Sequence, residues 1–166
     1  MSLRGTSATA ACNLDGRKQP LLPIPKWPKL PKSVIDLWEF PAVKESLTIL
    51  ASYTISATGA LTSINIVAHS QAASCWLSNT PNGKFAYVGN GSGTISSYSI
   101  SPTGTLTLLN ATAANEGIAA TGDSWIRADG KYLYTAYLHA GVVLSYTINA
   151  DGTLTKTWAC SFNTYS

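Results

Sequence analysis

The segment Tyr98-Ser-Ile-Ser-Pro-Thr-Gly-Thr-Leu-Thr107 has two further copies along the chain. Tyr53-Thr-Ile-Ser-Ala-Thr-Gly-Ala-Leu-Thr62 precedes it by 45 residues, and Tyr146-Thr-Ile-Asn-Ala-Asp-Gly-Thr-Leu-Thr155 follows it by 48. A second motif shares this period, because Pro81-Asn-Gly-Lys-Phe-Ala-Tyr87 returns 47 residues later as Ala128-Asp-Gly-Lys-Tyr-Leu-Tyr134. Two independent motifs with one period indicate a repeated structural unit.

Each unit consists of short alternating segments separated by glycine turns, a pattern typical of half-buried β-strands. We expect strands over residues 50–55, 61–67, 75–78, 85–89, 94–100, 106–112, 124–128, 132–138, 142–148 and 154–160, with turns at Gly59, Gly83, Gly104, Gly130 and Gly152. Four antiparallel strands in a period of about 40 to 50 residues are typical of propeller blades. The sequence therefore predicts an all-β fold, a partial β-propeller of about two and a half four-stranded antiparallel blades.

A closed propeller has about four to eight blades, and each blade buries its two faces against its neighbours. An open arc leaves two apolar faces and several strand edges in water. We therefore interpret the chain as a fragment, and we expect that the missing blades or another chain are needed to close the propeller. The tyrosines that recur at one repeat position, Tyr53, Tyr98 and Tyr146, are expected to pack between blades.

The segment Phe85-Ala-Tyr-Val-Gly-Asn-Gly-Ser-Gly-Thr-Ile-Ser-Ser-Tyr-Ser-Ile100, with Pro81-Asn-Gly-Lys before it and a Gly-Thr-Leu-Thr turn after it, resembles the lactonase-type seven-bladed propellers. That group includes 6-phosphogluconolactonase-like and carboxy-cis,cis-muconate cyclase-like proteins. It grades into repeat proteins with a Tyr-Val-Thr-Asn motif, from which Tyr87-Val-Gly-Asn90 differs by one residue. The resemblance covers residues 49–160 and implies a propeller of this type. It also implies a Cys-His pair near the channel, where this sequence has Cys75-Trp76.

Residues 1–48 carry neither repeat motif, and six of the eight prolines lie between Pro20 and Pro41. Proline at this density disfavours helices and central strands. We therefore divide the chain into a proline-rich irregular arm, residues 1–48, and the partial propeller, residues 49–166. A short helical turn is expected over residues 34–40. The arm is either a ligand for an aromatic groove or a segment unrelated to the repeats.

Charge is concentrated in the arm. Residues 1–48 hold seven of the eleven Lys and Arg and four of the eight acidic residues, so the repeats are neutral. This balance excludes a basic nucleic-acid surface on the repeats. No apolar run reaches the ~18 residues of a membrane span, and residues 1–30 lack the apolar centre of a secretory signal. Cytoplasmic and extracellular locations both remain open.

The three cysteines, Cys12, Cys75 and Cys160, lack the spacing of metal ligands. Cys75 is interpreted as a small buried residue, since free cysteine usually behaves as an apolar side chain. We expect neither a metal site nor a cofactor.

Ligands of propellers bind around the central channel, which the innermost strand of each blade lines. Trp76 and Asp123 each lie seven residues before a turn glycine, and we expect them at equivalent places on successive inner strands. Asp123 is the first catalytic candidate, because a carboxylate at the channel can orient water as a general base. The alternative is that this carboxylate only caps a turn or binds backbone amides.

Three further residues are considered. Arg127 is a candidate clamp for a substrate carboxylate or phosphate, the alternative being a solvated arginine of the turn. His69 is a candidate acid or base in a loop before the first complete blade, the alternative being a surface histidine. His139 lies at an expected hairpin on the outside and ranks last.

The resemblance implies a lactonase or cycloisomerase, with these residues as its candidate groups and a small anionic or lactone molecule as its substrate. Two alternatives stay open. One is a non-catalytic secreted binding module, and the other is a remnant without a function of its own. Fold resemblance cannot choose among them.

Overall fold

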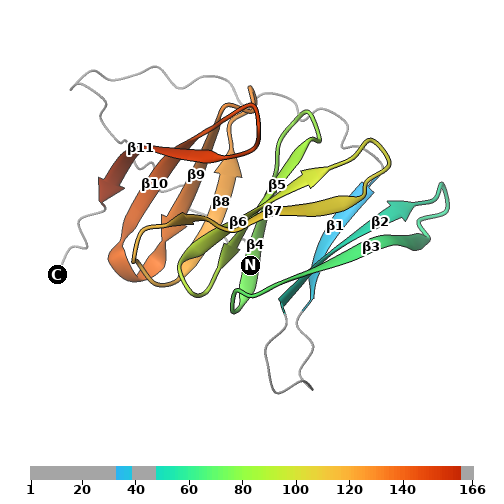
Figure 1. The fold of residues 1–166 in the computed structure, drawn as a ribbon, viewed down its shortest axis with the longest axis horizontal. Coiled ribbons are helices and arrows are strands. Elements are labelled where there is room, and N and C mark those ends of the chain that lie inside the picture. The colour runs from blue at the N-terminus through green and yellow to red at the C-terminus, as the bar shows by residue number, and fades with distance from the viewer. Residues whose placement is uncertain (1–32, 39–47, 162–166) are drawn as a thin grey trace, which may run out of the picture.

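The computed structural model describes the backbone of residues 33–38 and 48–161 and the side chains of residues 49–161. It contains three antiparallel sheets arranged as an arc (Figure 1). The first blade is β1 (Ser33–Trp38), β2 (Thr48–Ile55) and β3 (Leu61–His69); the second is β4 (Ser74–Asn79), β5 (Phe85–Asn90), β6 (Thr94–Ile100) and β7 (Leu106–Asn115); the third is β8 (Thr121–Ile126), β9 (Tyr132–Tyr137), β10 (Val142–Ile148) and β11 (Leu154–Ser161). The predicted partial β-propeller is confirmed.

The five predicted turn glycines all have positive φ, between 68° and 85°. Each lies between consecutive strands of one sheet, as in a blade built of hairpins. Strands β6 and β10 have the predicted bounds, whereas the first strand of the third blade begins and ends earlier than expected. Residues 127–130 form the turn instead, because the Gly130 amide donates to the Arg127 carbonyl at 2.8 Å.

Part of the predicted irregular arm belongs to the first blade. Residues 33–38 form strand β1, which pairs antiparallel with β2, so the expected helical turn and irregular backbone are wrong for this segment. β1 pairs with β2 as β5 pairs with β6, which places it at the second-strand position of a blade. Among the described residues the first blade has no innermost strand. The boundary between residues 48 and 49 stays a prediction.

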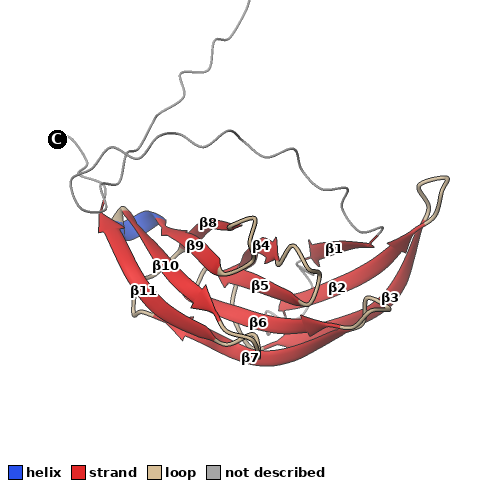
Figure 2. Cartoon of the chain, turned by 90° about the horizontal axis from the view of Figure 1, so that it is seen from above, coloured by secondary structure: helices blue, strands red, loops and turns tan. Residues whose placement is uncertain are grey.

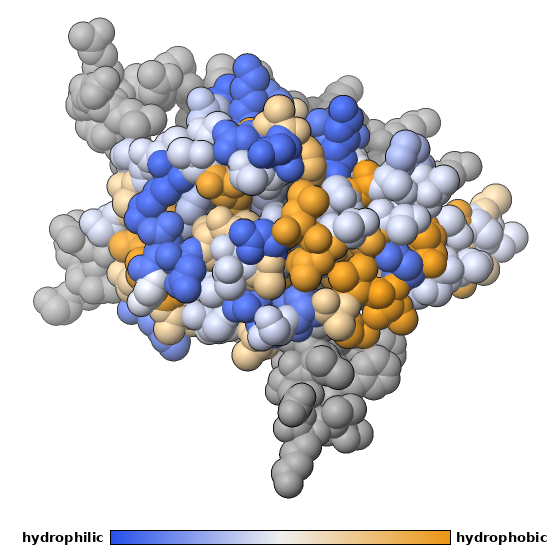
Figure 3. Space-filling model, viewed as in Figure 1, coloured by the Kyte–Doolittle hydropathy of each residue, from blue (hydrophilic) through white to orange (hydrophobic). Residues whose placement is uncertain are grey.

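Figure 2 shows the three sheets as a curved stack, with β4 and β8 on its concave side and β3, β7 and β11 on its convex side. Several of the large apolar side chains left exposed lie on the outer strands β3 and β7, namely Leu61, Ile66 and Leu109. Hydrophobic surface gathers over these two strands in the space-filling view (Figure 3).

The core consists of two layers, one at each junction between blades. Leu50 of the first blade packs with Val88, Tyr98 and Leu106 of the second. Tyr87 and Ile95 of the second blade pack with Leu133, Leu144 and Tyr146 of the third. Tyr98 and Tyr146 are no more than 1% exposed, which confirms that these repeated tyrosines pack between blades.

Candidate functional site

Strands β4 and β8 are the innermost strands of the second and third blades, and they lie next to each other. Leu77 of β4 pairs with Val88 of β5, and Ser124 of β8 pairs with Thr135 of β9. Val88 and Thr135 are equivalent in the repeat, so Trp76 and Asp123, each one residue earlier, occupy equivalent places. Both are exposed. The predicted equivalence is confirmed.

Both inner strands have irregular pairing beside these residues. The register shifts between Ser74 and Trp76 on β4 and between Thr121 and Ser124 on β8. Bulges of this kind redirect side chains and are frequent next to active sites. Cys75 lies in the first irregularity and is exposed, with its thiol 3.1 Å from the Ala73 carbonyl oxygen. The prediction that Cys75 is buried is wrong, because the bulge turns its side chain outward.

The carboxylate of Asp123 is exposed on β8, and one oxygen accepts a hydrogen bond from the Ser124 backbone amide at 2.8 Å. This bond orients the side chain locally while the residue stays accessible to solvent. The arrangement fits the backbone-binding alternative and leaves the carboxylate able to reach a ligand.

Arg127 lies in the turn after β8 and is committed to local partners. Its guanidinium is 2.6 Å from the Asp129 carboxylate and 5.1 Å from the centroid of the Tyr132 ring. Four residues of extended chain separate it from Asp123, which is about 13 Å along the strand. The structure therefore does not place the two candidates side by side.

His69 ends strand β3 and is only 4% exposed. The Gln71 backbone amide lies 3.3 Å from Nδ1, and the Ser74 hydroxyl lies 2.8 Å from Nε2. His69 is therefore neither in a loop nor on the surface, because it ends a strand and the second blade covers the imidazole. Its role as an acid or base on the channel side stays a prediction. His139 is exposed in the short 3₁₀ turn η1 (Leu138–Ala140) between β9 and β10.

The contacts of His69 continue as a directional chain of hydrogen bonds. Nδ1 accepts from an amide, so the neutral ring carries its proton on Nε2 and donates to Ser74. Ser74 then donates to the side-chain oxygen of Asn90 at 2.8 Å, and Asn90 donates to Thr94 and Ser96. Every donor in this chain meets an acceptor only when the imidazole is neutral. Burial also lowers the pKa of His69.

We expect the free energy of unfolding to fall as the pH drops below about 6.5, the ordinary pKa of histidine. The unfolded chain binds a proton there that the folded chain binds only at lower pH, so stability is lost by up to about 1.4 kcal/mol per pH unit between the two pKa values. Urea unfolding at pH 5 to 8 measures this slope.

The exposed His139 provides the control for this prediction. His69→Gln should remove the pH-dependent part attributed to the imidazole, whereas His139→Gln should keep it. An unchanged slope in His69→Gln would contradict the assignment.

Arg127 lies at the other end of β8 from the His69 cluster. Thr121, at the start of β8, donates to the Asn90 carbonyl in the His69 cluster at 2.8 Å, while Arg127 follows the far end of the same strand. A six-residue strand spans roughly 20 Å. Sequence reasoning missed Asn90, which is fully buried and joins four hydroxyl-bearing residues through its side chain and carbonyl. An asparagine in a strand after glycine gives no separate signal of this role.

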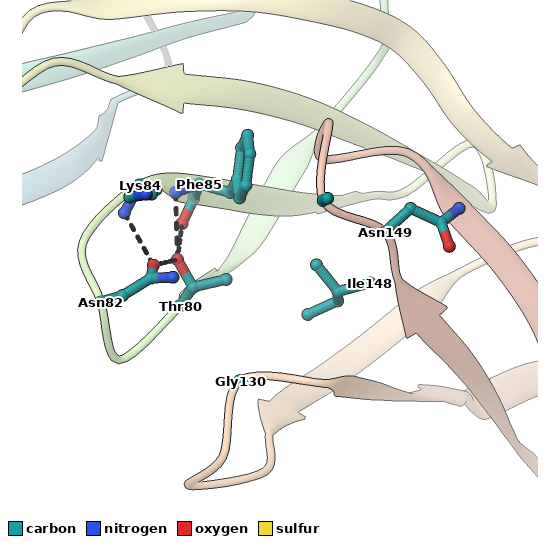
Figure 4. Close-up of a pocket in the computed structure, with 8 residues that line it drawn as sticks. Thr80, Asn82, Lys84, Phe85, Gly130, Ile148 and Asn149 are labelled. Carbon is teal, nitrogen blue, oxygen red and sulfur yellow. Dashed lines mark hydrogen bonds between the residues drawn. The ribbon is translucent and has the colours of Figure 1, made fainter.

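A shallow groove of about 250 Å³ lies between the turns of the second and third blades, lined by Thr80, Asn82, Lys84, Phe85, Gly130, Ile148, Asn149 and Ala150. Thr80 and the Lys84 amide both donate to the Asn82 side-chain oxygen (Figure 4). The polar groups of this turn thus satisfy one another. None of the predicted site residues lines the groove.

Known proteins with adjacent four-stranded blades of this kind resemble the chain in sequence and in structure. Residues 42–163 match the family model "Lactonase, 7-bladed beta-propeller". The chain belongs to this family. No curated protein matches the sequence.

Solved structures show how much of a lactonase propeller is present. A protein from Bacteroides uniformis provisionally assigned as a 6-phosphogluconolactonase is 23% identical with a TM-score of 0.62, and the match covers 74% of this chain and 38% of that protein. The periplasmic gluconolactonase of Pseudomonas aeruginosa is 15% identical with a TM-score of 0.56, covering 70% of this chain and 36% of that one. These similarities show the fold. The chain therefore spans well under half the length of these structures.

Within the described part of this lactonase-family chain, no cluster of three or more His, Cys, Asp or Glu side chains is arranged to hold a metal ion. The same residues include no helix long and apolar enough to cross a membrane.

Proposed function

We propose that this chain forms a section of a lactonase propeller in which Asp123 is the general base for lactone hydrolysis once further blades complete the channel. The supporting observation is the exposed carboxylate at the irregular part of β8, an innermost strand of the blade stack. This position is where propellers of this architecture bind ligands.

The chemistry needs one carboxylate and one water molecule. Asp123 removes a proton from water as the oxygen attacks the lactone carbonyl carbon. The ring C–O bond then breaks, and the departing alkoxide takes the proton that Asp123 removed from water, which gives the open hydroxy acid and regenerates the carboxylate. Groups that stabilise the oxyanion have to come from other blades, because Arg127 is paired with Asp129.

The chain by itself is expected to hydrolyse gluconolactone at a rate close to background. A propeller active site depends on groups from several blades that are held in place before the substrate binds. Extension to seven blades with family members' repeats should restore hydrolysis, measured as acid release at constant pH. Strong hydrolysis by residues 1–166 alone would contradict the need for further blades.

The role of Asp123 is tested in the extended protein. Asp123→Asn should lower kcat by about 10² to 10⁴, the range of general-base catalysis. Asp129→Asn changes the same functional group at the exposed turn and should retain most activity. If the extended protein stays inactive, the non-catalytic binding module becomes the better interpretation. Undiminished activity in Asp123→Asn would contradict the assigned role.

A further inference from the structure

The third blade has one covered and one open face. On β9, Leu133, Thr135 and Tyr137 are buried toward the second blade, while Tyr132, Tyr134 and Ala136 are half-buried. Trp125 is 53% exposed and stacks on Tyr134 with 5.9 Å between ring centroids. At the repeat position of Tyr134, Tyr87 of the second blade is 1% exposed. The open face therefore carries the aromatic residues of a blade interface without their cover.

The first blade has the complementary open face. Leu61 is 58% exposed, whereas Leu106 at the same repeat position is 2% exposed. Tyr53 is likewise half-buried, where Tyr98 and Tyr146 are fully buried. In the second and third blades these positions pack against the preceding blade. The first blade presents them to solvent.

The contacts inside the chain show how the two kinds of face fit together. The turn of the third blade packs on the second blade so closely that a Cβ added to Gly152 would lie 2.6 Å from the Phe85 ring. The Tyr87 hydroxyl donates to the Gly152 carbonyl at 3.0 Å. Gly104 of the second blade packs on Ile64 of the first in the same way, at 2.6 Å. Gly59, the equivalent glycine of the first blade, has no such neighbour within 4 Å.

The two open faces lie at opposite ends of the arc, with the β2–β3 turn at one end and the third blade at the other (Figures 1 and 2). They therefore cannot cover each other within one molecule. A second copy of the chain supplies each face with the partner that its repeat positions have inside the molecule.

We propose that the first blade of one copy packs on the third blade of a second copy, head to tail. The Gly59 turn lies over Tyr132 as the Gly152 turn lies over Phe85, and the Tyr134 hydroxyl donates to the Gly59 carbonyl. Leu61 and Tyr53 then cover the Trp125–Tyr134 stack. This interface is heterologous, so it forms rings or open chains according to its rotation. It uses the same two faces that further blades would cover in the proposed function, and the oligomeric state of the chain tests it separately from hydrolysis.

The test is the oligomeric state of the intact chain, measured by sedimentation at concentrations up to about 100 μM, where an interface with a micromolar Kd is nearly saturated. The wild-type protein should form dimers or larger species. Leu61→Asp and Trp125→Asp should each weaken association at least about tenfold by placing a charge in the interface. Tyr134→Phe, which loses one hydrogen bond, should weaken it roughly three- to tenfold.

Mixing the two charge variants distinguishes this interface from others. Leu61→Asp keeps an intact third blade and Trp125→Asp an intact first blade, so one unaltered interface remains and a one-to-one heterodimer should form. Leu109→Asp, at an apolar side chain of the second blade that is 45% exposed and belongs to neither end face, should associate like the wild type. Circular dichroism checks that each variant keeps its strands.

Two results would overturn the proposal. One is a wild-type chain that stays monomeric at the highest concentration. The other is a mixture of folded variants that forms no heterodimer, because that result indicates a symmetric or non-specific contact. A monomer that binds separately supplied blades of the same family would assign the open faces to those blades instead of a second copy.

Discussion

Gly93→Ala is expected to lower the free energy of unfolding by about 2 to 5 kcal/mol, the sum of left-handed backbone strain and overpacking. Gly93 has a φ of 86°, and an added Cβ would lie 1.8 Å from the Ile118 carbonyl oxygen. That atom belongs to the backbone that leads from the second blade into the third, so no side-chain rotation relieves the contact. The substitution forces two blades apart at their connection.

Gly117→Ala is the matched control, because Gly117 also has positive φ, 68°, but no atom lies near an added Cβ. It should cost about 1 kcal/mol, the backbone strain alone. Urea unfolding followed by tryptophan fluorescence measures both variants. Equal losses would show that the contact with the connecting segment has little energetic weight.

Tyr146→Ala is expected to cost about 3 to 5 kcal/mol, as large-to-small changes of buried aromatic side chains do. Tyr146 is 1% exposed between the second and third blades, and its hydroxyl lies 3.0 Å from that of Tyr137. Truncation leaves a cavity in this layer and removes the buried partner of Tyr137. Both effects lower stability.

Tyr53→Ala makes the same change at the equivalent position of the first blade. Tyr53 is half-buried and has no preceding blade among the described residues, so we expect a loss of about 1 kcal/mol at concentrations that favour the monomer. The difference between the two losses measures how much packing against a neighbouring blade contributes to the free energy of unfolding, beyond the contribution of the tyrosine within its own blade. A similar loss in both variants would contradict the importance of packing between blades.

The blades follow from local features of the sequence. Alternating residues over Thr94–Ile100 and Val142–Ile148 predict β6 and β10 with their observed bounds. Successive side chains of a strand point to opposite faces, so the pattern can be recognised from adjacent residues alone. Glycines at the turns supply positive φ that other residues adopt only with strain. The repeat then assigns equivalent places to Trp76 and Asp123 without any structure.

Other features depend on residues that are distant in the sequence. The proline-rich composition of residues 1–48 predicts an irregular segment and gives no sign of β1, which forms by pairing with β2. The burial of His69 depends on Ser74, Asn90 and Tyr98 of the next blade. Its neighbours in sequence, Ala68 and Ser70, are both exposed, so no adjacent apolar residue marks the position as buried.

The candidate site divides in the same way. Residue type and repeat position were enough to place Asp123 on an inner strand, because strand order is the same in every blade. The separation of Asp123 from Arg127 required the three-dimensional arrangement, since an extended strand carries residues that are close in sequence far apart in space. Whether the face of a blade is covered depends on the blade beside it. The repeat motif of a blade has the same residues with or without that neighbouring blade, so the motif does not predict which faces are buried.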